Sequence, residues 1–387
     1  MYNMVVNQLV DDGHVGAASA VAASTLAQMP TKAQNNHALA RRLQGRAPDT
    51  AAGGGLDLED NNATTGTQAA AYRTCWVAPG AGGAAAFGAD GTHAAVGAAD
   101  GSVRLLDAAL LAQGGAQDPV LRVYNEHRQA VTDLDFHPGA NANLLVSASQ
   151  DATLRFYNFP GAPRASRQCT DTHAIHAVRF HPAGGHLLVG TAHHSLHLYD
   201  VATFRCFTST QPMEEHSAPI AAVAWAADGK SYASVAGPAL KLWDGRTCRC
   251  SHTVPMAHRG EAVTSVAFSH SGRYVLTAGA DGMARLWDVA AAKSLLTYEG
   301  GGGGGEGGGG GGGGGGERAA AYFCAGEALV GGAVGGGSEL LLWDAKSGAL
   351  AQRLAGHAAP LRALACSAAA PVLLSCSADG QVRGWVE

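Results

Sequence analysis

Hydrophobic and polar residues alternate in short runs that recur along most of the chain. Residues 262–268 (AVTSVAF) alternate as a half-buried strand does, SHSGR follows as a turn, and residues 274–280 (YVLTAGA) form a second apolar run. A DG hairpin signal then leads into a third run, MARLWD, which ends at Asp288. Three strands joined by two turns predict an antiparallel sheet. The same order recurs in residues 131–158, 176–200, 221–244 and 361–386.

Each unit closes on a large residue, usually aromatic, followed by Asp or a substitute for it. Four of the six intervals between these pairs fall in the roughly 40–45 residues of a WD-repeat blade. The first interval contains an extra loop, LLAQGGAQDPV, and the fifth contains a glycine tract. One sheet cannot bury both faces, whereas seven packed radially can, so the pattern predicts an all-β, seven-bladed WD40 β-propeller. The closing pairs are Leu106-Asp107, Tyr157-Asn158, Tyr199-Asp200, Trp243-Asp244, Trp287-Asp288, Trp343-Asp344 and Trp385-Val386.

A propeller closes when a strand from one end of the chain joins the blade at the other end. The run YRTCWV (residues 72–77) precedes the first unit, and Glu387 directly follows the third strand of the last unit. We therefore expect residues 72–77 to supply the outer strand of the last blade. The propeller is then predicted to span residues 72–387.

Three repeats carry a recurring set of polar residues, which we call the blade networks. In each set, a His before the first strand is expected to bond an Asp in the second turn, and a Ser or Thr with the closing aromatic completes a buried network. Because the sets recur with the blade period, we interpret them as structural rather than as catalytic His–Asp pairs. The sixth unit lacks both His and Asp, and the third has His194 in place of the Asp. The predicted network residues are His127, Ser147 and Asp151 (with Tyr157 in place of Trp), His258, Thr277, Asp281 and Trp287, and His357, Ser375, Asp379 and Trp385.

The composition narrows the class of protein. The chain is 47% hydrophobic and 15% charged, with a net charge of −5, so most of it can bury a core and no strongly basic nucleic-acid surface is expected. The eight cysteines form no CxxC pair, and we interpret them as reduced, as in the cytosol or nucleus. The N-terminus shows no signal-peptide pattern, and no apolar run predicts a membrane-spanning helix.

Residues 1–45 are predicted to form a helical segment ahead of the propeller. Two short helices are expected within residues 2–29, and the pattern QLxxDGHxxAA between them resembles the LisH-type dimerisation motif, with His14 where an aromatic residue is usual. So short a pair must pack on something to bury its apolar face. We interpret it as a homodimerisation segment, with docking onto the propeller as the alternative. The predicted interface residues are Tyr2, Val5, Val6, Leu9, Gly13, Val15 and Ala18.

Two further segments have a composition that does not build a core. Residues 46–71 are small and polar and are expected to be a flexible linker. Residues 300–316 are glycine at every position but Glu306, which predicts a flexible loop before the sixth blade. A phosphate-binding glycine loop is not expected there, because no helix start with Lys-Ser/Thr follows the tract.

No motif for catalysis or for a cofactor is found in the chain. GxSxG, HExxH and Walker patterns are absent from the sequence. The adjacent pair His193-His194 lies in a predicted hairpin turn without nearby acidic or Cys ligands, so metal binding is not expected. We therefore expect a protein that is not an enzyme and that carries no cofactor.

The segments around and within the blades resemble one WD-repeat family. YNMVVNQLVDDGHVGAA, GGGLDLED with YRTCWV, VTDLDFHP, HLLVGTAHHSLHLYDVATFRCF and ALKLWDGRTCRC are similar to the family of cleavage stimulation factor subunit 1, the WD-repeat subunit of the mRNA 3′-end cleavage stimulation factor. The similarity covers nearly the whole chain and is most specific in blades three and four. The glycine tract departs from the family, and blade six is the poorest match.

The resemblance implies a nuclear, non-catalytic scaffold of pre-mRNA 3′-end cleavage and polyadenylation. Such a subunit dimerises through its N-terminus, binds the scaffold subunit of the cleavage stimulation factor and contacts the RNA polymerase II C-terminal domain. RNA is read by another subunit, so no sequence-specific RNA binding is expected here. The alternative is a WD-repeat substrate adaptor of a ubiquitin ligase or another protein-interaction scaffold, although residues 31–71 are short for the extra helical module of such adaptors.

Overall fold

The computed structural model describes residues 72–79, 82–113, 118–139, 143–159, 161–208, 215–299, 320–324, 327–333, 338–367 and 371–387. The chain divides into two compact units, Met1–Leu56 and Asp57–Glu387, and every described residue belongs to the second. The predicted dimerisation segment with its interface residues, the linker 46–71 and the glycine tract 300–316 lie outside the described residues.

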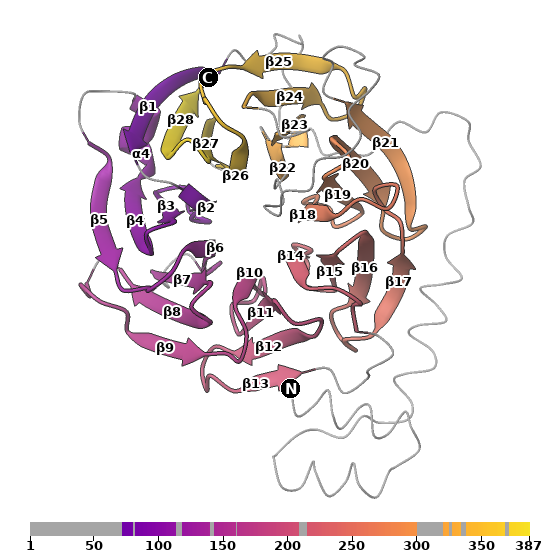
Figure 1. Ribbon diagram of the computed structural model, residues 1–387, viewed down its shortest axis with the longest axis horizontal. Helices are drawn as coiled ribbons and strands as arrows, with labels where there is room; N and C mark the ends of the chain where they lie inside the picture. Colours follow the sequence, from indigo (N-terminus) through magenta and orange to yellow (C-terminus); the bar gives the residue numbers. More distant parts are fainter. Residues whose placement is uncertain are drawn as a thin grey trace, which may run out of the picture. The chain divides into compact units, whose positions relative to one another are not determined.

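The described residues form seven four-stranded antiparallel sheets arranged as blades around a common centre (Figure 1). This arrangement confirms the predicted seven-bladed propeller. In the first six blades the strands follow chain order from the innermost to the outermost. Blades 1 to 3 consist of β2 (Gly82–Phe87), β3 (His93–Ala98), β4 (Ser102–Asp107) and β5 (Val120–Asn125); β6 (Val131–Phe136), β7 (Leu144–Ser149), β8 (Thr153–Asn158) and β9 (Arg167–Thr170); and β10 (Ile175–Phe180), β11 (His186–Thr191), β12 (Leu196–Asp200) and β13 (Cys206–Thr208).

The second half of the ring repeats the plan. Blades 4 to 6 consist of β14 (Ile220–Trp225), β15 (Ser231–Ala236), β16 (Ala239–Asp244) and β17 (Cys250–Val254); β18 (Val263–Phe268), β19 (Tyr274–Gly279), β20 (Met283–Asp288) and β21 (Lys293–Glu299); and β22 (Ala320–Cys324), β23 (Leu329–Ala333), β24 (Leu340–Asp344) and β25 (Leu350–Leu354). Blade 7 contains β26 (Leu361–Cys366), β27 (Val372–Ser377) and β28 (Gln381–Val386).

The ring closes as the sequence predicts. The first described strand, β1 (Arg73–Pro79), pairs antiparallel with β28 and is the outer strand of blade 7. The pairing runs from Arg73 opposite Val386 to Pro79 opposite Gln381. Both chain ends of the propeller are therefore held in one sheet, which removes an open edge.

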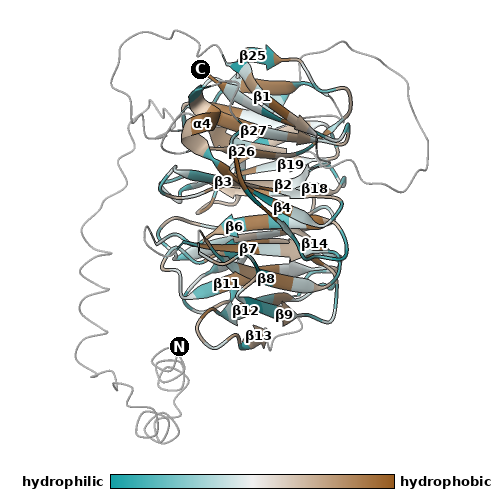
Figure 2. Ribbon diagram, turned by 90° about the vertical axis from the view of Figure 1, so that its left-hand side faces the viewer, coloured by the Kyte–Doolittle hydropathy of each residue, from teal (hydrophilic) through white to brown (hydrophobic). Residues whose placement is uncertain are grey.

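The hydrophobic core lies between neighbouring blades. Phe156 of blade 2 and Val178 of blade 3 belong to one buried cluster, and Leu240 of blade 4 packs in another with Trp287 of blade 5. A strand in the middle of a blade is covered on both faces, which is why all six residues of β19 are buried. Figure 2 shows this from the side, with apolar residues along the stacked strands.

The extra loop of blade 1 contains a short helix that the sequence reading did not predict, α4 (Ala108–Gln113). The Asp107 carboxylate caps it by accepting hydrogen bonds from the amides of Ala109 (2.8 Å) and Leu110 (3.1 Å). Leu111 is buried in a cluster with Leu106. Because Leu106 stands where other blades have an aromatic residue, the helix supplies the missing apolar bulk. No helix among the described residues is long and apolar enough to cross a membrane.

One expectation about the cysteines is wrong. Cys324, at the end of β22, and Cys366, at the end of β26, are joined in a disulfide, with their Cα atoms 5.6 Å apart. The two residues hold equivalent positions on the innermost strands of adjacent blades, so the fold places them side by side although 42 residues separate them in sequence. None of the other six cysteines forms a disulfide.

Candidate functional site

The blade networks form closed chains of hydrogen bonds. In blade 5, His258 lies before β18 and Asp281 in the turn after β19, and His258 Nδ1 is 2.7 Å from Asp281 Oδ1. His258 Nε2 is 2.8 Å from Thr277 Oγ1, which also accepts a hydrogen bond from Trp287 Nε1 at 2.9 Å. Since His258 is wholly buried, its imidazole cannot reach a substrate. The arrangement instead ties a turn and two strands of one sheet together.

Blades 7 and 2 repeat this geometry. His357 lies 3.1 Å from Asp379 and 2.8 Å from Ser375, to which Trp385 Nε1 donates at 2.8 Å. In blade 2, His127 Nδ1 is 3.1 Å from Asp151 and His127 Nε2 is 2.6 Å from the hydroxyl of Ser147. Thus the structure brings together the predicted His, Ser or Thr and Asp residues of all three networks, together with Trp287 and Trp385. The buried hydroxyl of Tyr157, predicted to stand in for Trp in blade 2, has no hydrogen-bond partner among the described residues.

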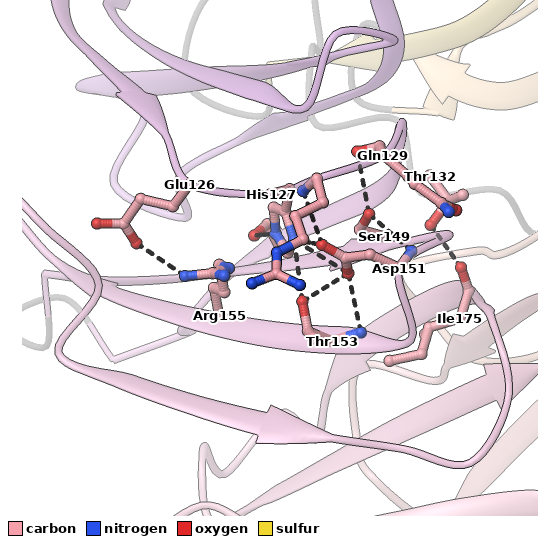
Figure 3. Close-up of polar contacts among 11 residues, drawn as sticks. Glu126, His127, Gln129, Thr132, Ser149, Asp151, Thr153, Arg155 and Ile175 are labelled. Atoms are coloured by element: carbon pink, nitrogen blue, oxygen red, sulfur yellow. Dashed lines mark hydrogen bonds and ion pairs between the residues drawn. The ribbon is translucent and has the colours of Figure 1, made fainter.

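Asp151 is the most heavily bonded carboxylate of these networks (Figure 3). It accepts hydrogen bonds from Thr153 Oγ1 at 2.6 Å and from the Arg128 amide at 2.9 Å, in addition to His127. Burial alone would raise the pKa of Asp151, but these hydrogen bonds outweigh burial and lower the pKa to about 2. The carboxylate stays ionised at neutral pH and holds the turn. Next to it, Arg155 pairs with Glu126 at 3.2 Å.

Blade 4 contains an incomplete network that the sequence reading missed. His216 Nε2 is 2.6 Å from Ser234 Oγ, and Trp243 Nε1 donates to the same oxygen at 2.8 Å. No Asp follows, because the turn between β15 and β16 is Gly237-Pro238. The signal was present in the sequence, since HSAP at residues 216–219 parallels HAAP at residues 357–360 before the last repeat.

Blade 3 uses other residues for the same purpose. His194 stands in the turn at the Asp position, is largely exposed and lies 3.3 Å from Glu215. The carboxylate comes instead from Asp171, which accepts hydrogen bonds from His197 Nδ1 (2.8 Å) and the Tyr199 hydroxyl (2.6 Å). The hydrogen bond to Asp171 is the main reason why the pKa of His197 rises to about 9.

The innermost strands of all seven blades line one central cavity, and its polar lining was also missed. Asp133 of β6 pairs with Arg179 of β10 at 2.6 Å, and the second guanidinium nitrogen of Arg179 lies 3.4 Å from the Tyr322 hydroxyl of β22. Asp135, two residues further along β6, accepts a hydrogen bond from the Phe180 amide at 2.6 Å. Burial raises the pKa of the Asp135 carboxyl to about 7. The contacts of Asp133 and Asp135 join blade 2 to blade 3, and the contact with Tyr322 joins blade 3 to blade 6.

Histidines gather beside blade 3 without forming a metal centre. The His193 ring lies 3.7 Å from that of His194 and 5.0 Å from that of His173, measured between ring centroids. Within the described part of the chain, no group of three or more His, Cys, Asp or Glu side chains is arranged to hold a metal ion.

Comparison with known families identifies the repeats. The model of the WD domain, G-beta repeat, matches residues 119–158, 248–288 and 348–385. Each matched stretch begins near the outer strand of one blade and ends in the third strand of the next. The three matches cover blades 2, 5 and 7, the blades whose networks contain the His–Asp pair.

Relatives with recorded functions match parts of the chain. Cleavage stimulation factor subunit 50 of Arabidopsis thaliana is 35% identical over 203 residues, which are 50% of this chain and 47% of that protein. Pre-mRNA-processing factor 19 of Oryza sativa subsp. japonica is 27% identical over 45% of the chain and 32% of its own length. Nuclear distribution protein PAC1 of Arthroderma benhamiae is 26% identical over 69% of the chain and 61% of its own length. The chain thus spans less than two thirds of each of these relatives. Its described residues form a seven-bladed β-propeller in which three stretches match the WD repeat, and half of the chain is similar to a cleavage stimulation factor subunit.

Proposed function

We propose that this protein is a non-catalytic scaffold subunit of the nuclear machinery that cleaves and polyadenylates pre-mRNA. The observation that carries the proposal is the 35% identity to cleavage stimulation factor subunit 50 over half of the chain. A second relative, pre-mRNA-processing factor 19, also belongs to mRNA processing by name.

The propeller itself supports a scaffold. The His and Asp side chains that could suggest catalysis are buried in bonds that hold turns to strands. A ring of loops on two faces offers sites for extended peptides of partner proteins. We propose that the principal partner is the scaffold subunit of the cleavage stimulation factor, with the RNA polymerase II C-terminal domain as a further partner. Residues 1–45 are proposed to make the protein a homodimer.

The test is a pull-down of the purified scaffold subunit with the full chain and with residues 72–387. We expect both to retain it, because the contacts are assigned to the propeller. Dimeric full-length chain should bind a dimeric scaffold more tightly through avidity. Retention by residues 1–71 alone would contradict this division of labour.

RNA binding provides the second arm. With a net charge of −5, the protein is expected to make few contacts with RNA phosphates and so to release few counterions on binding. Binding to a GU-rich RNA should therefore be weak and should vanish at moderate salt. Filter binding measures this directly. Tight binding by the isolated chain at physiological salt would replace the scaffold proposal with an RNA-reading function.

A further inference from the structure

A pocket with a volume of about 100 Å³ lies between blades 3 and 4. Its walls are apolar: Leu188 and Leu196 come from blade 3, and Tyr232 and Trp243 from blade 4. Phe207 of β13, which also lines the pocket, is 37% exposed. A mostly apolar lining with a few polar side chains, among them His216, is typical of a ligand site.

The pocket lies beside Trp243, the closing aromatic of blade 4. At two other blade interfaces a tyrosine of the outer strand covers the closing aromatic of the next blade. Tyr124 lies against Tyr157, with ring centroids 4.4 Å apart, and Tyr298 lies 6.0 Å from Trp343. Tyr124 is paired with Val103 in the sheet, and Tyr298 with Ala284.

In blade 3, the outer-strand position that corresponds to Tyr124 and Tyr298 is the one opposite Leu196 of β12. The described part of β13 ends at Thr208, which pairs with His197, one residue short of that position. Among the described residues of β13, Phe207 is the one that lines the pocket.

The pocket also borders the incomplete network of blade 4. In blade 5, the Asp281 carboxylate accepts hydrogen bonds from His258 Nδ1 and, at 2.9 Å, from Arg285 Nη2. Arg285 also donates a hydrogen bond to the Ala257 carbonyl. Blade 4 has the equivalent of each donor, since Lys241 Nζ donates to the Glu215 carbonyl at 2.8 Å. The turn of blade 4, Gly237-Pro238, supplies no carboxylate in the position of Asp281.

The missing carboxylate leaves a buried donor without an acceptor. His216 lines the pocket and is 4% exposed, and its Nδ1 has no hydrogen-bond partner among the described residues. Trp243 donates to Ser234, so the Ser234 hydroxyl proton is available to His216 Nε2, and the imidazole proton is left on Nδ1. Burial keeps the ring neutral by lowering the pKa of His216 to about 3. A second lining side chain, Trp225, also has an unpaired buried N–H.

We propose that this pocket is a recognition site for an extended peptide segment of a partner protein. The peptide inserts one large apolar side chain in front of Trp243 and offers an oxygen acceptor to His216 Nδ1. A peptide supplies both groups at once, because a main-chain carbonyl accompanies every side chain. A buried donor without an acceptor raises the free energy of the unbound protein, so a hydrogen bond from His216 Nδ1 to the peptide favours the bound state. The inference deepens the proposed scaffold function, on which it rests, by naming a site and a ligand class.

The test uses a random dodecapeptide phage library panned on the full-length chain. We expect the selected peptides to share a large apolar residue. Leu198 of β12 also lines the pocket. Synthetic peptides, measured by fluorescence polarisation, should bind the pocket-filling variant Leu198→Trp at least tenfold more weakly than the unchanged chain. Leu295→Trp, at an exposed position on β21, is the matched control and should bind normally. Phe207→Asp at the mouth repeats the test without altering the buried wall, in case Leu198→Trp fails to fold. Failure to select peptides, or equal binding to the filled pocket, overturns the proposal.

A turn exchange tests the contact with His216. Replacing Gly237-Pro238 by Ala-Asp-Gly, the turn of blade 5, supplies an internal acceptor for Nδ1. The melting temperature should rise and peptide affinity should fall. If the melting temperature rises while affinity stays constant, the proposed contact with His216 is wrong. The pull-down of the scaffold subunit does not depend on the peptide-binding test. A negative result in the peptide test alone would reject the pocket, whereas a negative pull-down would reject the proposed scaffold function.

Discussion

At the scale of single residues, a few buried polar groups distinguish one blade from another. The chain Trp–Ser/Thr–His recurs in blades 4, 5 and 7, but the Asp that completes it is present only in the last two. A buried donor or acceptor without a partner costs about 1–3 kcal/mol. Residues that look alike in the sequence therefore differ in what their neighbours allow.

Asp281→Ala should destabilise the protein by about 1–3 kcal/mol, because His258 Nδ1 and Arg285 lose their shared acceptor. Chemical unfolding measures the loss, and Glu261→Ala, at an exposed position, is the control. Partner binding at low temperature should survive in Asp281→Ala. Lost binding with unchanged stability would instead place Asp281 in a functional site.

The Asp171–His197 pair should make stability depend on pH. The folded-state pKa of His197, about 9, lies above the ordinary 6.5 of histidine. The pair therefore stabilises the fold fully below about pH 6.5, and this stabilisation is lost as the pH rises through about 9. The melting temperature of the unchanged protein should fall more between pH 7 and pH 10 than that of His197→Gln, measured by circular dichroism. Parallel curves for the two proteins would show that the pair does not titrate as proposed.

At the scale of elements, the lengths of outer strands and loops decide where the repeat departs from its average. The extra loop of blade 1 holds α4, which fills the space left by Leu106. The pocket beside Trp243 lies between blades 3 and 4 and is lined in part by Phe207 of the outer strand β13. Both departures involve a loop or an outer strand rather than the inner strands alone, because the inner strands must pack against two neighbours.

Shortening the glycine tract 300–316 to about six residues should change the free energy of unfolding by less than roughly 1 kcal/mol, because loop-closure cost grows only with the logarithm of length. Differential scanning calorimetry checks this. A large fall in melting temperature would mean that the tract has a structural role.

At the scale of the whole molecule, one strand from the start of the propeller closes the ring. Pairing of β1 with β28 makes blade 7 depend on residues more than 300 positions apart. Folding is complete only when both ends meet, and the blades stabilise one another through shared interfaces rather than singly.

Deleting residues 1–30 should convert a dimer into a folded monomer, because the predicted apolar face of Tyr2, Val5, Val6 and Leu9 is removed while the propeller strands remain. Multi-angle light scattering gives the mass, and circular dichroism verifies the fold. A monomeric full-length protein, or an unchanged mass after deletion, would be incompatible with N-terminal dimerisation.

The sequence by itself determined the number of blades, the order of strands and the closing strand, because the alternation of apolar residues and the turn signals repeat with a fixed period. It also pointed to the network residues of blades 2, 5 and 7, where His, Ser/Thr and Asp recur at constant spacing. Only the tertiary structure decided what lies between blades. The Cys324–Cys366 bond, the Asp133–Arg179 pair and the pocket beside Trp243 each join residues of different repeats. Periodicity describes a blade from within, whereas such contacts depend on how neighbouring blades pack and on which side chain fills the space between them.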